Sequence, residues 1–527
     1  MEPLEITENQ ILHKIDNLDP SKSQGPDNIS ITFIKKTAES IVKPLLHIYK
    51  TSLDTSSVPD LWKTASICAV FKKGDKKLLN NYRPISLTCI FVKILESIIR
   101  DHITHFLDQN EIITKEQFGF VRNKNTTIQL LCSLKDWTDG IEENCATDCI
   151  YFDFKKAFDT VPHKRLKVKI DAFSFHNKIS NWLKDFVTNR KQFVKIRNSN
   201  STTLEVTSGI PQGSVLGPIL FILYINDITE HINSKIVLFA DDIKLYKTIQ
   251  NNKNDTKQLQ DDINKLYRWS EIWLLKFNTT KCNKITYEKK ASLQQHTTYH
   301  IAQNQLENIS EIKDLGVLFE ENLNPSTHIY SKVKKASQIL GIVRRNFCNL
   351  QADIVVNLYK TLIRSQFDYA HCVWQPYKQK DIQKIENIQM RATKMIKDLK
   401  NLSYTERLKK LKLPTMRYRS IRGCLIEVYK ICNGYYTEEV RNKLSKFRPP
   451  SSLRGHKFTL LHERHTTKQR KNFFYHKNIN IWNNLPLSVI SQENVHLFKN
   501  ALDKIFLKQD IYYNFRAIVN LPANARY

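Results

Sequence analysis

The sequence lacks the features that mark several common classes of protein. It contains no run of about 18 or more apolar residues, so no membrane-spanning helix is expected. Its 10 cysteines are scattered without a Cys-x-x-Cys motif. The nearest pair, Cys145 and Cys149, has no partners at zinc-knuckle spacing, so we expect reduced structural thiols rather than a zinc site. The acidic N-terminus, Met1 to Ile6, lacks a signal-peptide pattern, which predicts residence inside the cell.

Acidic residues are scarce relative to basic ones. The chain has 52 Asp and Glu residues against 81 Lys and Arg residues, which gives a formal net charge of +29 and a pI near 9.5. This charge favours a polyanionic partner, and a nucleic-acid backbone fits it best, with a membrane surface as the alternative. The 527 residues, 41% of them hydrophobic, suit three or four structural units with substantial cores.

Glycine is rare as well, and its distribution points to one segment. Only 12 glycines occur, and Gly209, Gly213 and Gly217 fall within residues 208–218. Glycine permits a positive φ and close approach of another backbone. The segment is therefore either a loop on which a nucleotide or a nucleic-acid strand lies against the main chain, or a plain connector before the apolar helix expected at 219–225.

Among the acids that are present, Asp241 and Asp242 stand between two apolar stretches, 235–239 and 243–246. Both stretches are predicted to be short strands, which places the paired carboxylates at or beside the tip of a hairpin. Burying two adjacent anions is unfavourable unless a cation compensates them, and hard oxygen ligands suit Mg²⁺. An Asp-Asp pair also occurs in ordinary turns, so the pair alone does not decide.

A third acid, Asp153, lies within the apolar stretch 150–154, which predicts a strand buried on both faces. It is either a strand-end carboxylate bonded to backbone amides or a metal ligand shared with Asp241. Only the fold could bring these two residues together. Three carboxylates can hold two Mg²⁺ ions that flank a phosphoryl group during in-line displacement.

Four segments, taken in their order and spacing, resemble the reverse transcriptase of LINE-type, non-LTR retrotransposons. They are FDFKKAFDTVPH at 152–163, SGIPQGSVLGP at 208–218, YIND at 224–227 and FADD at 239–242. Shorter matches extend the resemblance over nearly the whole chain, at 23–27, 71–75, 81–86, 117–120, 273–278, 281–282, 315–317, 358–364, 391–394, 454–456, 472–474 and 481–486.

The resemblance implies an α+β fold of the right-hand polymerase type, with fingers, palm and thumb, followed by a mostly helical, basic C-terminal region. We expect residues 1–60 to form an N-terminal extension and the start of the fingers, and residues 61–320 the fingers and palm. Residues 321–400 would form the thumb, and residues 401–527 a basic nucleic-acid-binding region.

The resemblance also implies roles for individual residues. Asp153, Asp241 and Asp242 match the catalytic carboxylates that hold two Mg²⁺ ions, with Mn²⁺ as a substitute and Asp242 assisting the geometry. Lys281 is a candidate general acid for the departing pyrophosphate. Lys72 matches a cation that grips the triphosphate, and Lys73 is the alternative to it.

Four further residues complete the expected substrate site. Arg83 would grip the triphosphate together with the lysine, since Arg can clamp phosphate with two parallel hydrogen bonds. Phe158 matches the bulky residue under the sugar, whose ring would clash with a 2′-hydroxyl group and favour deoxynucleotides. Gln212, beside Gly213, would position the template–nucleotide pair.

Helical periodicity and charge complete the expectations. Apolar residues at helical intervals predict a palm helix over 259–277, and a basic stretch with the same spacing predicts a thumb helix over 331–345. A third stretch interleaves basic and apolar residues and favours backbone binding. Its basic residues are Arg407, Lys409, Lys410, Lys412, Arg417, Arg419 and Arg422.

The predicted function is RNA-directed DNA polymerisation with Mg²⁺, using template RNA, a DNA primer or target, and deoxynucleoside triphosphates. The family implies nuclear work, with a cytoplasmic ribonucleoprotein stage. Relatives usually carry an endonuclease before the polymerase, and Met1 lies close to the segment 23–27, so we expect that region to be absent. The alternatives are an inactive or domesticated nucleic-acid-binding remnant and an intron-type reverse transcriptase.

Overall fold

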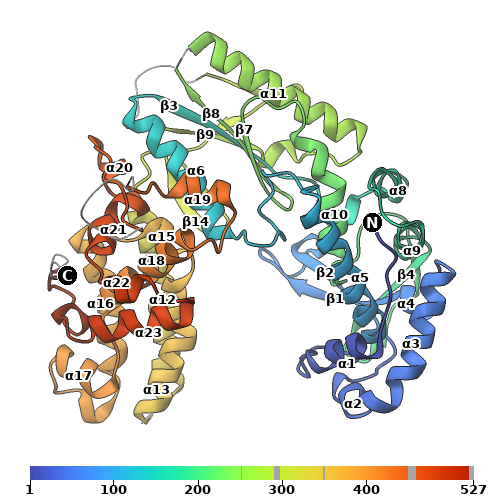
Figure 1. Ribbon diagram of the computed structural model, residues 1–527, viewed down its shortest axis with the longest axis horizontal. Helices are drawn as coiled ribbons and strands as arrows, with labels where there is room; N and C mark the ends of the chain where they lie inside the picture. Colours follow the sequence, from blue (N-terminus) through green and yellow to red (C-terminus); the bar gives the residue numbers. More distant parts are fainter. Residues whose placement is uncertain (251, 290–296, 348–350, 449–457, 522–527) are drawn as a thin grey trace.

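The computed structural model describes residues 1–250, 252–289, 297–347, 351–448 and 458–521. The short match at 454–456 therefore lies outside the described residues. Figure 1 shows an arch in which an N-terminal lobe and a C-terminal lobe form the two legs and a central β-sheet joins them at the top. Separate helical and sheet regions confirm the expected α+β class.

The N-terminal lobe (residues 1–110 and 155–230) packs helices around a sheet of strand order β2-β1-β4-β5, with β6 also paired to β4. The hairpin strands β1 and β2 are antiparallel, and β4 runs parallel to β1. The strands are β1 (Thr64–Phe71), β2 (Tyr82–Leu87), β4 (Arg190–Ile196), β5 (Ser199–Asn200) and β6 (Leu204–Val206). The helices are α1 (Glu8–Asp16), α2 (Ile31–Lys36), α3 (Ala38–Asp54), α4 (Asp60–Lys63), α5 (Ile90–Gln109), α7 (Ala157–Thr160), α8 (His163–Ala172), α9 (Asn177–Val187) and α10 (Gly217–Ile225), with short turns η1 (Leu79–Asn81) and η2 (Asn226–Thr229).

The central sheet (within residues 115–153 and 235–320) has the strand order β12-β9-β3-β8-β7. Its strands are β3 (Ala146–Phe152), β7 (Lys235–Phe239), β8 (Asp242–Ile249), β9 (Asn283–Tyr287) and β12 (Glu307–Asn308). The helices α6 (Thr126–Glu142) and α11 (Asn252–Ile272) cover it, and η3 (Thr279–Lys281) precedes β9. The remaining short strands are β10 (His300–Ile301), β11 (Asn304–Gln305), β13 (Glu311–Asp314) and β14 (Val317–Glu320).

Both faces of the central sheet are covered, which explains why most residues of β3, β7 and β8 are at least partly buried. Successive strand side chains point to opposite faces. Ile150 of β3 packs in one core with Leu259 of α11, whereas the neighbouring Cys149 packs in the other core with Trp137 of α6. The predicted strand buried on both faces, the predicted hairpin at 235–246 and the predicted helix at 219–225 are confirmed.

Two boundaries differ from the sequence prediction. Strand β3 ends at Phe152, so Asp153 follows the strand instead of lying inside it. The reason is that the main chain turns there toward the segment after α11, where Asn278 N–H donates to the Asp153 carbonyl at 2.6 Å. Helix α11 begins earlier than predicted, at Asn252, and ends at Ile272, because Leu274 takes a left-handed φ of +57°.

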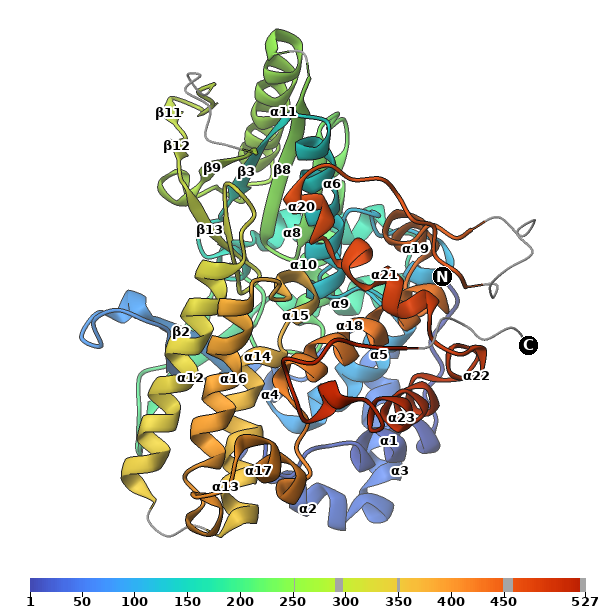
Figure 2. The ribbon, with the colours of Figure 1, turned by 90° about the vertical axis from the view of Figure 1, so that its left-hand side faces the viewer.

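The described residues of the C-terminal lobe (321–347, 351–448 and 458–521) are mostly helical, as expected. The central helix is α18 (Met416–Cys432), which packs against α15, α16, α21 and α23. Figure 2 shows α12 and α16 side by side along this lobe. The helix predicted over 331–345 is confirmed as part of α12. The other elements are α12 (Ser326–Asn346), α13 (Ala352–Leu358), the π-helical turn η4 (Tyr359–Arg364), α14 (Ser365–Asp368), α15 (His371–Trp374), α16 (Gln379–Thr393), η5 (Lys397–Leu399), α17 (Tyr404–Leu411), α19 (Glu438–Leu444), α20 (Lys468–Lys471), α21 (Phe474–Asn483), α22 (Leu487–Ile490), α23 (Val495–Phe506) and η6 (Asp510–Tyr512).

Among the described helices, none combines the length and the apolar character needed to cross a lipid bilayer.

Candidate active site

The turn between β7 and β8 presents the paired acids. Phe239 pairs with Asp242 across the hairpin, so Ala240 and Asp241 form a two-residue turn. Ala240 takes a left-handed φ of +54°. Two-residue hairpin turns need such positive φ values, which a non-glycine residue adopts only when its surroundings hold it there.

Gln117 supplies that support from the segment before α6. Its side chain is buried, and its Oε1 atom accepts the N–H groups of Ala240 at 3.0 Å and Gly119 at 2.8 Å. A Cβ atom on Gly119 would lie 2.5 Å from the Ala240 nitrogen, so only glycine permits this approach. Sequence analysis recognised the segment 117–120 as a family match without assigning it a role. A buried amide that bonds a distant turn has no local sequence signature.

Asp153 faces the same turn from the end of β3. Its carboxylate pairs with Lys281, with Oδ2 and Nζ 3.1 Å apart. Lys281 is brought there by η3, because Asn278 just before that turn bonds the Asp153 carbonyl. The side-chain partner of Asp153 is thus an ammonium group of a second predicted site residue.

One cavity of about 1420 Å³ collects most of the predicted site residues. Its lining includes Asp153 and Asp241 from the sheet, Lys281 from η3, Lys72 and Arg83 from the β1–β2 hairpin, and Phe158, Gln212 and Gly213 from the floor. Lys73 and Asp242 do not line it. The fold therefore distinguishes Lys72 from Lys73, which the sequence could not.

Burial and neighbouring negative charges raise the proton affinity of Asp241 and Asp242. Desolvation, followed by the negative charges of Asp241, Asp314 and Asp153, raises the pKa of Asp242 to about 7, although part of its side chain is exposed. Desolvation and the charge of Asp153 also raise the pKa of Asp241, against the opposing effects of Arg83 and Lys72. The local cations thus leave negative charge uncompensated.

This donor set fits a hard divalent cation. Mg²⁺ is commonly held by one or two carboxylates together with substrate phosphates rather than by a closed protein cage. Asp153 and Asp241 are two carboxylates that line one open cavity, as that description requires. A cation bound to them would relieve the repulsion that contributes to the raised pKa values of Asp241 and Asp242.

Behind Asp242, a buried ion pair fixes the strand. Lys244, two residues along β8, is 2% exposed and its Nζ atom lies 2.5 Å from Asp314 Oδ2. The same ammonium group donates to Gln129 Oε1 at 3.1 Å, and the Tyr151 hydroxyl group donates to Asp314 at 3.2 Å. Sequence analysis did not identify this network, whose members come from three strands and a helix.

The glycine-rich segment 208–218 approaches the protein's own main chain. Gly209 and Gly213 have φ values of +91° and +129°. A Cβ atom on Gly213 would lie 2.4 Å from the Ser86 carbonyl oxygen, and the Ser86 N–H donates to the Gln212 carbonyl at 2.7 Å. The glycines therefore join strand β2 to the floor of the cavity.

Contacts with neighbouring residues of the protein hold the side chains of Phe158 and Gln212 in place. The Phe158 ring stacks on Phe221 of α10, with centroids 4.4 Å apart, while it remains only half-buried in the cavity. Gln212 Nε2 donates to Asp159 Oδ1 at 2.7 Å. Both side chains are thus fixed before any substrate enters.

The basic stretch in the C-terminal lobe divides into two kinds of residue. Lys409, Lys410 and Lys412 are exposed. The arginines make contacts inside the lobe: Arg417 donates to the Phe515 carbonyl at 2.8 Å, and Arg422 pairs with Asp503 through two hydrogen bonds of 2.5 and 2.6 Å. The lysines are therefore the residues of this stretch that remain candidates for binding a nucleic-acid backbone.

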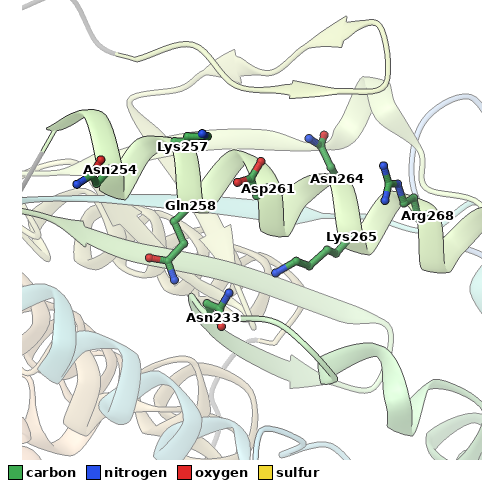
Figure 3. A pocket seen from close by; sticks show the side chains of 8 residues that line it. All are labelled: Asn233, Asn254, Lys257, Gln258, Asp261, Asn264, Lys265 and Arg268. Atoms are coloured by element: carbon green, nitrogen blue, oxygen red, sulfur yellow. The ribbon is translucent and has the colours of Figure 1, made fainter.

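A separate polar hollow of about 450 Å³ lies on α11 (Figure 3). Figure 3 shows side chains such as Lys257, Asp261 and Arg268 along the helix, with Asn233 from the segment before β7 below them. None of the residues that line this hollow lines the large cavity.

Comparison with known proteins matches the region that contains the cavity. A family model described as "Reverse transcriptase (RNA-dependent DNA polymerase)" matches residues 71–342, a range that includes every predicted site residue.

Among curated relatives, the probable RNA-directed DNA polymerase from transposon BS of Drosophila melanogaster is 25% identical over 412 residues, which is 76% of this chain and 45% of the relative. The RNA-directed DNA polymerase from mobile element jockey of the same organism is 25% identical over 416 residues, 74% of this chain and 44% of the relative. The chain thus spans less than half the length of these relatives. A solved structure of apo telomerase from Candida tropicalis gives a TM-score of 0.36 at 14% identity, over 53% of this chain and 58% of that one.

Proposed function

The chain belongs to the reverse transcriptase (RNA-dependent DNA polymerase) family, and on that premise we propose that it is the RNA-directed DNA polymerase of a non-LTR retrotransposon. In the proposed reaction, the primer 3′-hydroxyl oxygen attacks the α-phosphorus of a deoxynucleoside triphosphate. A P–O bond forms to the primer, and the bond to pyrophosphate breaks. The observation that carries the proposal is that Asp153, Asp241, Lys72 and Arg83 line one cavity.

Asp153 and Asp241, with Asp242 beside them, are the residues that would hold Mg²⁺, or Mn²⁺ in its place. Two such ions would polarise the attacking hydroxyl group and neutralise the leaving pyrophosphate. The protein's own contribution is the position of the carboxylates, which the Gln117 bonds to the hairpin turn and the Lys244–Asp314 pair maintain. Catalysis then comes mainly from positioning and charge neutralisation.

Lys72 and Arg83 are proposed to bind the triphosphate from the hairpin side of the cavity. Lys281 is proposed to protonate the departing pyrophosphate. It pairs with Asp153 in the structure, and engagement of Asp153 with a cation would free its ammonium group for that role. Phe158 would exclude the 2′-hydroxyl group, and Gln212 and Gly213 would support the template–nucleotide pair.

The nucleic acid would lie between the two lobes. Template RNA and a DNA primer or target are the proposed partners, and the exposed lysines and arginines of α12, such as Lys334 and Arg344, would contact their backbones. We propose the division of the chain into residues 1–60, 61–320, 321–400 and 401–527 on the same basis. Nuclear work after a cytoplasmic ribonucleoprotein stage would follow from this function.

The test is extension of a DNA primer on an RNA template by the purified chain, with Mg²⁺ present or removed by a chelator. We expect templated extension that stops on chelation and resumes when Mg²⁺ is restored. A folded chain that binds the primer–template without extending it would overturn the proposal in favour of a nucleic-acid-binding remnant.

A further inference from the structure

A cluster of soft ligand side chains lies in the C-terminal lobe, away from the catalytic cavity. His371, Cys372 and Cys424 are the only three metal-ligating side chains among the described residues whose ligand atoms all lie within 4.8 Å of one another. Cys372 and Cys424 are buried, and His371 is half-buried. None of the three lines the cavity that contains the carboxylates.

The spacing of the ligand atoms suits a tetrahedral ion. The His371 Nε2 and Cys372 Sγ atoms are 3.5 Å apart. Zinc bonds of about 2.3 Å to sulfur and about 2.0 Å to nitrogen, at tetrahedral angles, place a nitrogen and a sulfur ligand about 3.6 Å apart. The imidazole and the thiol therefore already stand near the separation that one shared ion requires.

The imidazole is oriented by a second hydrogen bond. Its Nδ1–H donates to the Asp368 carbonyl oxygen at 3.2 Å, which leaves the lone pair of Nε2 directed at the thiols. Metal-binding histidines commonly show this arrangement, in which the other ring nitrogen donates to a carbonyl or carboxylate group.

Gly423 provides the space for the ring. It lies inside α18, where glycine destabilises a helix by about 1 kcal/mol relative to alanine. A Cβ atom at this position would lie 2.2 Å from His371 Nε2. The helix thus omits a side chain where the imidazole must reach the neighbouring Cys424.

Helix α18 carries a second cysteine, Cys432, eight residues beyond Cys424. Among the described residues, Cys432 belongs to no group of three metal-ligating side chains with ligand atoms this close together. Cys432 is equally buried and serves as a matched control.

We propose that His371, Cys372 and Cys424 bind one Zn²⁺ ion, with a water molecule as the fourth ligand. Thiolate and imidazole ligands favour zinc over magnesium, so this site would be chemically separate from the carboxylates. The water would enter from the adjoining cavity of about 270 Å³, which His371 and Gly423 line. Two thiolates neutralise the ion, so the ammonium group of Lys477 would not oppose it.

Such an ion would join two helices from distant parts of the sequence. His371 and Cys372 begin α15, and Cys424 lies in α18. Because α15 also packs against α6 under the central sheet, the ion would fasten the C-terminal lobe to the sheet. Sequence analysis predicted no zinc site because the ligands have no motif spacing, and this proposal departs from that prediction.

The test is the zinc content of the full chain, purified under reducing conditions without chelator, dialysed against Zn²⁺ and then against metal-free buffer. We expect about one zinc per chain in the wild type and in Cys432→Ser, and less than about a tenth of that in Cys424→Ser. Gly423→Ala retains all three ligands and improves helix propensity, yet we expect it to lose zinc because its methyl group displaces the imidazole.

Folding and oxidation are controlled separately. Circular dichroism checks each variant, and if Cys424→Ser is unfolded, a Co²⁺-substituted wild type decides instead: a thiolate-to-cobalt charge-transfer band supports the site and its absence overturns it. A folded wild type without stoichiometric zinc, equal zinc in a folded Cys424→Ser, or a Cys372–Cys424 disulfide detected by thiol titration under these conditions would also overturn the proposal.

Discussion

Two regions of the molecule are rich in cations, and they use them in opposite ways. In the cavity lined by Asp153 and Asp241, Lys72 and Arg83 are exposed and form no ion pair with any residue that the structure describes. In the C-terminal lobe, Arg417 and Arg422 are bonded to carbonyl groups and to Asp503. The same residue types thus remain available to a substrate in one place and stabilise the fold in the other.

The difference shows what a net charge can predict. The charge of +29 indicates a polyanionic partner, but it does not say which cations contact that partner. An arginine whose donors are satisfied by the protein has little left to offer a phosphate group. Internal hydrogen bonding, which only the fold determines, separates the two populations.

Exchanging one arginine in each region would test this comparison most strongly. We expect Arg83→Ala to raise the KM for deoxynucleoside triphosphates by about 10- to 100-fold, since hydrogen bonds to charged groups contribute about 1.5–3 kcal/mol. Arg422→Ala should leave this KM unchanged and lower the free energy of unfolding by about 1 kcal/mol, a small value because Asp503 is partly exposed. Steady-state kinetics and chemical denaturation measure the two effects, and a reversed pattern would break the comparison.

A buried histidine of the C-terminal lobe extends the comparison to a titratable group. Desolvation, with the charges of Lys332 and Lys313, lowers the pKa of His328 to about 3, and its Nδ1 atom accepts the Leu318 N–H at 3.0 Å. The folded state therefore binds fewer protons than the unfolded state, whose histidine pKa is about 6.5. Its stabilising contribution is complete above pH 6.5 and is lost as the pH falls toward 3.

At pH 5 this loss amounts to about 2 kcal/mol. We expect His328→Gln, which can still accept the Leu318 N–H, to show a pH 7 to pH 5 loss of stability smaller than that of the wild type by this amount. Urea denaturation at the two pH values measures the difference. An equal loss in both proteins would show that His328 is not held neutral.

Near the carboxylate cavity, we expect the loss of an uncharged residue, Gln117, to reduce activity about as much as the loss of a cation. Gln117→Ala removes the acceptor for the Ala240 and Gly119 N–H groups and should lower kcat about tenfold, because one buried hydrogen bond contributes about 1–1.5 kcal/mol. Primer–template affinity should not change. Gln258→Ala, on α11 away from the cavity, is the control, and single-turnover extension is the measurement. Normal turnover by Gln117→Ala would show that the turn needs no such support.

The exposed lysines of α17 and its C-terminal cap give the smallest expected effect. Replacing Lys409, Lys410 and Lys412 together by alanine should reduce the slope of log affinity against log salt by up to about 3, since each phosphate contact contributes about one unit. The matched control replaces Lys36, Lys43 and Lys50 on the outer helices of the N-terminal lobe. Fluorescence anisotropy over a salt series measures the slopes, and equal slopes for the two triple variants would remove these lysines from the interface.

Much of the fold and site could be predicted from local patterns. The central strands pack against one core on each face, so their apolar runs could be recognised in the sequence. The hairpin at Asp241 and Asp242 was predicted from the apolar stretches on either side of the two acids. The resemblance supplied residues that the fold then placed in one cavity, including Lys281 beside Asp153. Motif order therefore carried information about tertiary proximity that periodicity alone did not.

What could not be predicted depends on contacts between distant segments. The choice of Lys72 over Lys73 follows from the orientation of a hairpin, and the support of Ala240 by Gln117 from a buried amide. Helix α11 ends at Ile272 because Leu274 takes a left-handed φ, and a leucine in the sequence does not indicate that conformation. The cluster around Cys424 combines two helices whose spacing in the sequence carries no metal-binding signal.

The most direct test of the central claim, that the carboxylate cavity is a polymerase site, is single-turnover primer extension on an RNA template by Asp241→Asn and Asp261→Asn. Both variants make the same chemical change, but Asp261 lies in the separate hollow on α11. We predict that Asp241→Asn loses at least about 10²–10³-fold in rate while retaining primer–template affinity, and that Asp261→Asn extends normally. Undiminished extension by a folded Asp241→Asn would contradict the account.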